Sequence, residues 1–113
     1  IIGSFVLTSL LARYDEALIS YQKAERLLKD ALGQYYPDYL GILDNIGFYL
    51  LKLDRHHEAL GYYQQCESLG RYIYGERHPQ YLNYLLNIAS TLGNLSRHED
   101  SFRLLTKCQS TIK

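Results

Sequence analysis

The stretch "DRHHEALGYYQQC", from Asp54 to Cys66, combines two adjacent histidines, acids and a cysteine. Imidazole, carboxylate and thiolate groups are the usual ligands of zinc, and they also form nucleophile–base pairs. Either chemistry needs several such groups to converge at one place in the fold. This stretch is not unique, because the related segments "ARYDEALISYQKA" and "SRHEDSFRLLTKC" begin at Ala12 and Ser96, at equal distances before and after Asp54.

The repetition favours a structural interpretation of these side chains. His56 matches His98, but the first copy has Tyr14 there, which indicates a packing site for a flat ring rather than a metal ligand. His57 is replaced by an acid in both other copies, which is typical of an exposed position near a helix start. His78, in a link between copies, is interpreted as a solvated turn or helix-start residue. We therefore predict no metal and no cofactor.

No arrangement of side chains indicates catalysis. The serines and cysteines lie at repeat positions that packing explains, and equivalent acids at Glu16, Glu58 and Asp100 suit helix starts. The glycines are dispersed, so no phosphate-binding loop is predicted. We expect the chain not to be an enzyme.

Composition narrows the classes of partner. Lys+Arg and Asp+Glu each number 12, so no strong field is available to attract nucleic acid or an anionic membrane. No apolar run reaches the roughly 18–20 residues that span a bilayer. The first residues, "IIGSFVLTSLLA", lack a basic leader and are interpreted as a helix that has lost its beginning, so we expect a fragment of a longer protein.

The two cysteines occupy equivalent positions, Cys66 and Cys108, of successive copies. Packed helix axes lie roughly 8–10 Å apart, whereas a disulfide needs Cα atoms within about 7 Å. We therefore predict free, buried thiols and an intracellular, cytoplasmic protein.

The constant offset between these segments divides the chain into a truncated copy at 1–33, a copy at 34–75 and a truncated copy at 76–113. Each copy has two segments with apolar residues at steps of three and four, which predicts two helices. In the middle copy the first stripe runs Leu40, Leu43, Ile46, Leu50 and Leu53, and the second runs Ala59, Leu60, Tyr63, Cys66, Leu69 or Gly70, and Ile73.

Helix-limiting residues and small residues lie where paired helices require them. Gly75 marks a helix end and Pro79 a helix start. Small side chains recur where two helices must touch, as in Gly47 and its equivalent Ala89; the first copy departs from this with Phe5. The sequence predicts one all-α solenoid, residues 1–113, built from stacked antiparallel helix pairs.

Helix pairs with this pattern resemble tetratricopeptide repeats. The long unit, as in 34–75 and in "GERHPQYLNYLLNIASTLGNLSRHEDS", is similar to the repeats of kinesin light chains. Asn45 and Asn87 match the second asparagine of that family's pattern, while the first is replaced by Asp44 and Leu86. The glycine before the basic residue is replaced by Ala12, Asp54 and Ser96. The resemblance implies a right-handed superhelix that serves as a protein-binding adaptor or scaffold.

In a solenoid of helix pairs the first helices line the concave face. An asparagine there offers both a donor and an acceptor to an extended peptide backbone, and the resemblance implies this role for Asn45 and Asn87. The alternative is that each asparagine only holds neighbouring helices together. The predicted groove residues are Asp44, Asn45, Phe48, Leu51, Lys52, Asn83, Leu86, Asn87, Ser90 and Asn94. Gly41 completes the middle copy, and Ile2, Val6 and Ser9 are the positions in the first copy.

Lys52 is the only cation in this predicted groove, whereas family members that grip a chaperone's C-terminal carboxylate use several. A peptide-binding adaptor and a self-associating segment, whose apolar solenoid ends stack on further repeats or another chain, remain the two alternatives. Many of the 12 tyrosines lie in the links and near the ends of the second helices. They are expected to fill gaps between copies or, alternatively, to form a contact surface.

Overall fold

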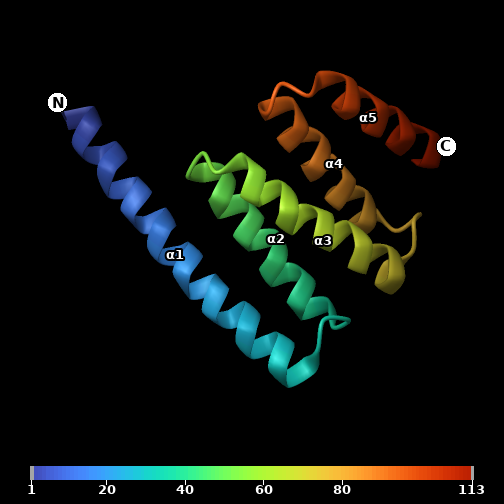
Figure 1. Ribbon diagram of the computed structural model, residues 1–113, viewed down its shortest axis with the longest axis horizontal. Helices are drawn as coiled ribbons and strands as arrows, with labels where there is room; N and C mark the ends of the chain where they lie inside the picture. Colours follow the sequence, from blue (N-terminus) through green and yellow to red (C-terminus); the bar gives the residue numbers. More distant parts are fainter. Residues whose placement is uncertain (1, 113) are drawn as a thin grey trace.

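The computed structural model describes the backbone of residues 2–112 and the side chains of residues 6–109. Five α-helices follow one another along the chain (Figure 1). They are α1 (Ile2–Leu32), α2 (Pro37–Lys52), α3 (His56–Tyr74), α4 (Pro79–Asn94) and α5 (His98–Ile112). No strand occurs within residues 2–112. Phe5 and Ile2, two positions singled out in the sequence, lie outside the described side chains.

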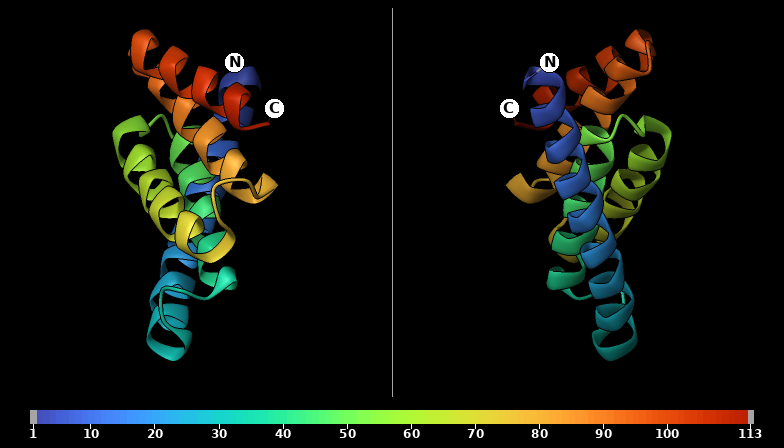
Figure 2. Two further views of the ribbon diagram at one scale, coloured as in Figure 1. Left: turned by 90° about the vertical axis from the view of Figure 1, so that its right-hand side faces the viewer. Right: turned by 90° about the vertical axis from the view of Figure 1, so that its left-hand side faces the viewer.

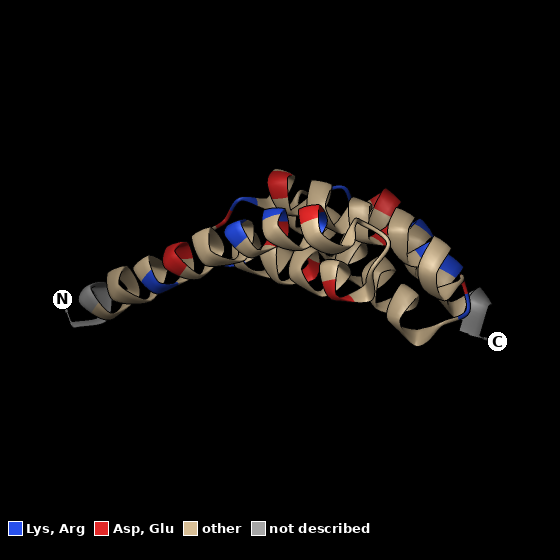
Figure 3. Ribbon diagram, turned by 90° about the horizontal axis from the view of Figure 1, so that it is seen from below, with Lys and Arg blue, Asp and Glu red and all other residues tan. Residues whose placement is uncertain are grey.

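Successive helices pack side by side in chain order, α1 on α2, α2 on α3, α3 on α4 and α4 on α5 (Figure 2). The result is a thin, extended body of 49 × 38 × 19 Å that curves into an arch (Figure 3). Basic and acidic positions are interspersed along this arch (Figure 3). The predicted all-α solenoid of antiparallel helix pairs is confirmed.

Proline and glycine set the limits of the helices as the sequence predicts. Pro37 and Pro79 occupy the first turns of α2 and α4, where a missing N–H costs no hydrogen bond. Gly33 and Gly75 follow α1 and α3 with φ of 85° and 88°, a left-handed backbone that favours glycine. His78 is the N-cap of α4, and its Nδ1 accepts a hydrogen bond from the Gln80 N–H at 3.0 Å. The predicted helix-start role of His78 is confirmed.

The turn inside each complete helix pair depends on a residue with positive φ. Asp54 and Ser96 have φ of 63° and 62°, and the next amide, at Arg55 or Arg97, donates back to a carbonyl of the preceding helix at 2.8 Å. The corresponding residue of the first copy is Ala12, and α1 continues through it without a break, so the prediction of two helices is wrong for this copy. Alanine has the highest helix propensity and disfavours the left-handed region, which accounts for the single long helix.

The core consists of the apolar stripes that the sequence predicts. Leu40, Leu43 and Ile46 of α2 are fully buried, and Leu50 is 1% exposed. These side chains pack with α3 and with the adjacent helices α1 and α4 in two clusters. A third cluster joins α4 and α5 around Leu85. Burial of these side chains is the main source of stability, at roughly 1.5–3 kcal/mol for each fully buried large apolar residue.

Small residues leave room for tyrosine rings at two close contacts. A methyl group added to Gly47 would lie 2.7 Å from the ring of Tyr63, and one added to Gly70 would lie 2.7 Å from the ring of Tyr84. The first contact joins the two helices of one pair, and the second joins successive pairs. Glycine at these positions therefore sets how closely the helices approach.

A repeated hydrogen bond also links successive pairs. The hydroxyl of Tyr39 donates to Glu25 Oε1 at 2.8 Å, and the hydroxyl of the equivalent Tyr81 donates to the equivalent Glu67 at 2.8 Å. Burial raises the pKa of both tyrosines, and the adjacent glutamate raises it further. Tyr39 and Tyr81 therefore remain neutral donors at physiological pH. These tyrosines fill space between copies, as one of the two alternatives predicts.

Cys66 and Cys108 are both free and buried, at 0% and 3% exposed, as predicted. Burial raises the pKa of the Cys66 thiol, which leaves little reactive thiolate. We predict that neither thiol reacts with Ellman's reagent in the native protein, and that Cys108, on the terminal helix α5, reacts before Cys66 as urea is added. The single-cysteine variants Cys66→Ser and Cys108→Ser separate the two signals. Rapid reaction of Cys66 without denaturant would contradict this packing.

Candidate functional site

The histidine-rich turn around Asp54 and His56 does not bring several metal-ligating side chains together among the described residues. His56 is half-buried, and its Nε2 lies 2.7 Å from Asp54 Oδ1, while His57 is exposed. Within the part of the chain that the structure describes, no group of three or more His, Cys, Asp and Glu side chains is placed to hold a metal ion. The pair formed by His56 and Asp54 lies at the turn between α2 and α3.

The predicted groove residues of the middle and last copies lie on α2 and α4, whereas Val6 and Ser9 of the first copy lie on α1. The helices α2 and α4 are connected through their side chains. Asn87 Nδ2 of α4 donates a hydrogen bond to Asp44 Oδ1 of α2 at 3.0 Å. We call the surface formed by Asp44, Asn45, Phe48, Lys52, Asn83, Leu86, Asn87, Ser90 and Asn94 the α2/α4 face. Asp44 and Asn87 are half-buried, and the other seven residues of this set are exposed.

Asp44 and Asn87 form the polar centre of the α2/α4 face. Burial raises the pKa of the Asp44 carboxyl, and the hydrogen bond from Asn87 lowers it by less. The side-chain oxygen of Asn87 makes no hydrogen bond to another described residue, so it is available as an acceptor. The interhelix bond matches the alternative in which asparagine holds neighbouring helices, and it leaves part of the amide for a ligand.

Asn45, the sequence equivalent of Asn87, makes a different contact. Its Nδ2 donates to the Gly41 carbonyl of its own helix at 3.0 Å, and its side chain is exposed. All four asparagines of the chain lie on α2 and α4, and they are Asn45, Asn83, Asn87 and Asn94. A side-chain amide supplies both a donor and an acceptor, so the α2/α4 face offers the chemistry that an extended peptide backbone requires.

Two exposed apolar side chains accompany these amides. Phe48 and Leu86 are each 45% exposed, and Lys52 Nζ lies 5.2 Å from the centre of the Phe48 ring. Phe48 also contacts Tyr49 edge to face, with ring centres 5.2 Å apart. Leu51 differs from the prediction, because it is half-buried and packs against the core cluster around Ile46. We therefore leave Leu51 out of the α2/α4 face.

The raised pKa of Asp44 predicts a dependence of stability on pH. Between its ordinary value of 3.8 and the raised folded value, the folded state binds more protons than the unfolded state, so stability falls as pH rises. Asp44→Asn removes this loss and keeps an oxygen for Asn87. We expect the variant to be more stable than the wild type at neutral pH, with the difference shrinking below about 3.8. Urea unfolding of both proteins across this range measures it, and a variant less stable at neutral pH would contradict the assignment.

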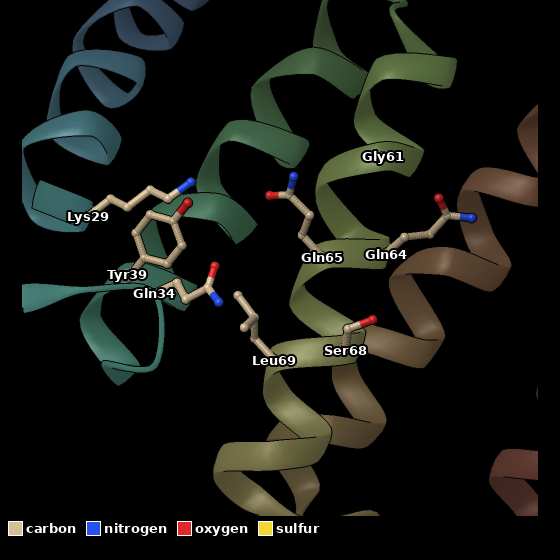
Figure 4. Close-up of a pocket in the computed structure, with 8 residues that line it drawn as sticks. All are labelled: Lys29, Gln34, Tyr39, Gly61, Gln64, Gln65, Ser68 and Leu69. Carbon is tan, nitrogen blue, oxygen red and sulfur yellow. The ribbon is translucent and has the colours of Figure 1, made fainter.

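Sequence reasoning missed a hollow surface elsewhere on the molecule. A cavity of about 420 Å³ lies between α1 and α3 and is lined by Lys29, Gln34, Tyr39, Gln65 and Leu69, among others (Figure 4). The available signal was Gly61, which lines this cavity and has Ile19 and Arg103 as its equivalents in the other copies. A glycine within a helix, at a position where the other copies have large side chains, indicates that the surface of this copy differs from theirs.

Comparison with known proteins identifies the repeat. A family model described as "Tetratricopeptide repeat" matches residues 38–111. The match begins at the start of α2 and covers the α2/α4 face and both complete helix pairs. No curated protein matches the chain. Within the described residues, no helix is long and apolar enough to cross a membrane.

Proposed function

Because this chain belongs to the tetratricopeptide repeat family, we propose that it binds an extended peptide segment of a partner protein on the α2/α4 face. Repeats of this family generally mediate protein–protein interaction. We further propose an adaptor or scaffold role of the kinesin-light-chain-like type, with 1–33, 34–75 and 76–113 as copies of one solenoid. The two buried free thiols support a reducing, intracellular site of action.

The observation that carries the proposal is the continuity of the polar surface from α2 to α4. The bond between Asn87 and Asp44 fixes the two helices in register, and exposed amides lie on both sides of it. Adjacent residues of an extended chain present carbonyl and N–H groups in alternating directions. The amides of Asn45 and Asn83 can satisfy such groups without reading the side chains of the peptide.

Phe48 and Leu86 would add selectivity to this backbone recognition. Each is nearly half exposed on a face whose other members are polar or charged. Exposed apolar side chains among hydrogen-bonding groups are typical of the anchor points at which a few residues supply most of the binding energy. Lys52 is the only basic residue of the α2/α4 face, so an apolar peptide with at most one acidic contact fits better than a strongly acidic one.

The proposal is tested by selecting random linear peptides on the chain and measuring each against Asn45→Ala plus Asn87→Ala. Since Asn87→Ala would leave Asp44 without its partner, Asp44→Asn is added to that variant so that no half-buried charge remains. Asp44→Asn alone is the matched control. Peptides that bind the control and fail to bind the triple variant, at unchanged helical signal, support the proposal. The proposal is refuted if no selected peptide distinguishes the control from the triple variant.

A second candidate function is self-association through the ends of the solenoid. Val6 and Leu7 of α1 are 56% and 57% exposed, and Phe102 of α5 is 71% exposed. The N-terminal part of α1 also extends away from the other helices (Figures 1 and 3). Sedimentation equilibrium of the wild type and of Leu7→Lys tests this function. A dimer that Leu7→Lys dissociates favours self-association, and a monomer at all concentrations rules it out.

A further inference from the structure

Two hollows between α1 and α3 join into one continuous trough. The first, of about 420 Å³, has Lys29, Gln34 and Tyr39 on one side and Gln65 and Leu69 on the other (Figure 4). The second, of about 440 Å³, is lined by Gln22, Arg55, Glu58 and Tyr62. Gly61 and Gln65 line both hollows. We call this surface the α1/α3 trough; it shares no residue with the α2/α4 face.

One face of α3 forms a wall of the α1/α3 trough along its whole length. Glu58, Tyr62, Gln65, Leu69 and Tyr72 follow one another at steps of three and four, so they lie on the same side of the helix. At about 1.5 Å per residue, the distance from Glu58 to Tyr72 is roughly 21 Å. An extended peptide rises about 3.3 Å per residue, so the trough accommodates about six residues of extended chain.

The trough ends on a pair of exposed tyrosines. Tyr35 and Tyr72 are 56% and 77% exposed, and their ring centres lie 4.9 Å apart at an interplanar angle of 52°. Tyr35 follows Gln34, and Tyr72 lies one turn beyond Leu69, so the pair continues the line of the trough. Two large rings in contact with each other and with water form an apolar platform for a side chain of a ligand.

Several polar side chains of the α1/α3 trough have no partner among the described residues. Gln22, Gln34 and Gln65 make no hydrogen bond to another described residue, and Lys29 makes no ion pair with one. Arg55 and Glu58, at the opposite end, neutralise each other in an ion pair. Three amides therefore lie along the trough with donors and acceptors available, together with Lys29, which makes no ion pair with a described residue.

Gly61 keeps the middle of the trough open. Glycine in a helix interior costs about 1 kcal/mol relative to alanine, and a methyl group added to Gly61 would meet no atom within 4 Å. Packing within the chain therefore gives no reason for glycine here, in contrast to Gly47 and Gly70. The other copies carry Ile19 and Arg103 at the equivalent positions, and either side chain would occupy the space where the two hollows meet.

We propose that the α1/α3 trough is a second binding site, which takes an extended peptide segment of a protein partner independently of the α2/α4 face. The amides of Gln22, Gln34 and Gln65 bind the peptide backbone, and the backbone passes closest to α3 at Gly61. The Tyr35–Tyr72 pair receives an apolar or aromatic side chain at one end. Lys29 favours an acidic residue of the peptide near that end.

The test uses one substitution at equivalent positions of two copies. Gly61→Ile places in the trough the residue that the first copy already has, and Arg103→Ile makes the same residue on α5 as the control. Gly61→Ile should melt at or above the wild-type temperature, because its side chain meets no obstacle. Peptides selected from a random linear library on the wild-type chain are then measured against both variants and against Phe48→Ala.

The expected result is a class of peptides whose Kd rises at least about tenfold with Gly61→Ile and is unchanged by Arg103→Ile and Phe48→Ala. The double variant of Gln65→Ala and Tyr72→Ala should weaken the binding of the same peptides. It provides the test if Gly61→Ile fails to fold. The proposal is overturned if no selected peptide distinguishes Gly61→Ile from Arg103→Ile. A dimer of the chain that Gly61→Ile abolishes would also overturn it, because the occupant would then be a second copy. Loss of every peptide with Phe48→Ala would leave only the α2/α4 face.

Discussion

Gly70→Leu is expected to destabilise the chain by about 3 kcal/mol, and adding Tyr84→Ile is expected to recover much of that loss. The Cβ of any residue at position 70 would lie 2.7 Å from the Tyr84 ring, inside the buried contact between α3 and α4. At the preceding interface the equivalent residues are Leu28 and Ile42, so two side chains of similar size stand there in place of the glycine and the tyrosine. The double variant transfers that combination to the second interface, and urea unfolding of all four proteins measures the coupling.

Gly61→Leu is the matched control on the same helix. No atom lies within 4 Å of a methyl group added at Gly61, so this change should raise stability by up to about 1 kcal/mol through helix propensity. Equal effects of Gly70→Leu and Gly61→Leu would show that the contact with Tyr84 does not limit the approach of α3 and α4. A double variant no more stable than Gly70→Leu would contradict the expectation that Tyr84→Ile makes room for the added leucine side chain.

Phe48→Ala is expected to weaken a peptide bound to the α2/α4 face by roughly thirty-fold or more, the effect of losing an anchor worth about 2 kcal/mol. Phe48 is 45% exposed, and its ring contacts Tyr49 and Lys52. Its truncation should therefore cost little of the folding free energy. Titration calorimetry with a selected peptide gives the affinity, and thermal melting gives the stability.

The control for this prediction is Phe102→Ala. Phe102 is 71% exposed on α5, so the same truncation removes an apolar surface of similar kind outside the α2/α4 face. Binding should be unaffected by this change. Equal weakening by the two substitutions would indicate nonspecific apolar contacts, and no weakening by Phe48→Ala would remove Phe48 from the site.

The architecture was accessible from sequence because its determinants are local and repeated. Apolar residues spaced three and four positions apart form the buried stripes of α2 and α4. Gly75 ends α3 and Pro79 begins α4. The positions of Asp44, Asn45, Phe48 and Lys52 along α2 follow from the same periodicity. Because the unit repeats, the sequence also predicts a structural role for the histidine-rich stretch rather than metal binding or catalysis.

Features that depend on side chains meeting across helices were not accessible in the same way. The hydrogen bond from Asn87 to Asp44 joins residues 43 positions apart and gives the two equivalent asparagines different partners. Leu51 packs against the core cluster around Ile46, a contact that the periodicity of α2 alone does not predict. The α1/α3 trough requires both the course of α1 and the absence of a side chain at Gly61.

The first copy shows that residues at equivalent positions of the repeat can adopt different backbone conformations. Alignment of the copies places Ala12 opposite Asp54 and Ser96, which occupy the left-handed turns. The repeat pattern alone carries no information on whether the chain turns at Ala12. Only the conformational preference of alanine distinguishes the continuous helix α1 from a helix pair.

The most direct test of the α2/α4 face as a peptide site is an NMR titration of the ¹⁵N-labelled chain with a selected peptide that fails to bind the triple variant of Asp44→Asn, Asn45→Ala and Asn87→Ala. The four asparagine side-chain amides give their own signals, and all four lie on α2 and α4. Binding at this face predicts that the signals of Asn45, Asn83 and Asn87 shift with one common Kd, together with the backbone amide of Phe48. Saturable binding that leaves these signals in place, with shifts confined to α3, α5 or the chain ends, would contradict the account.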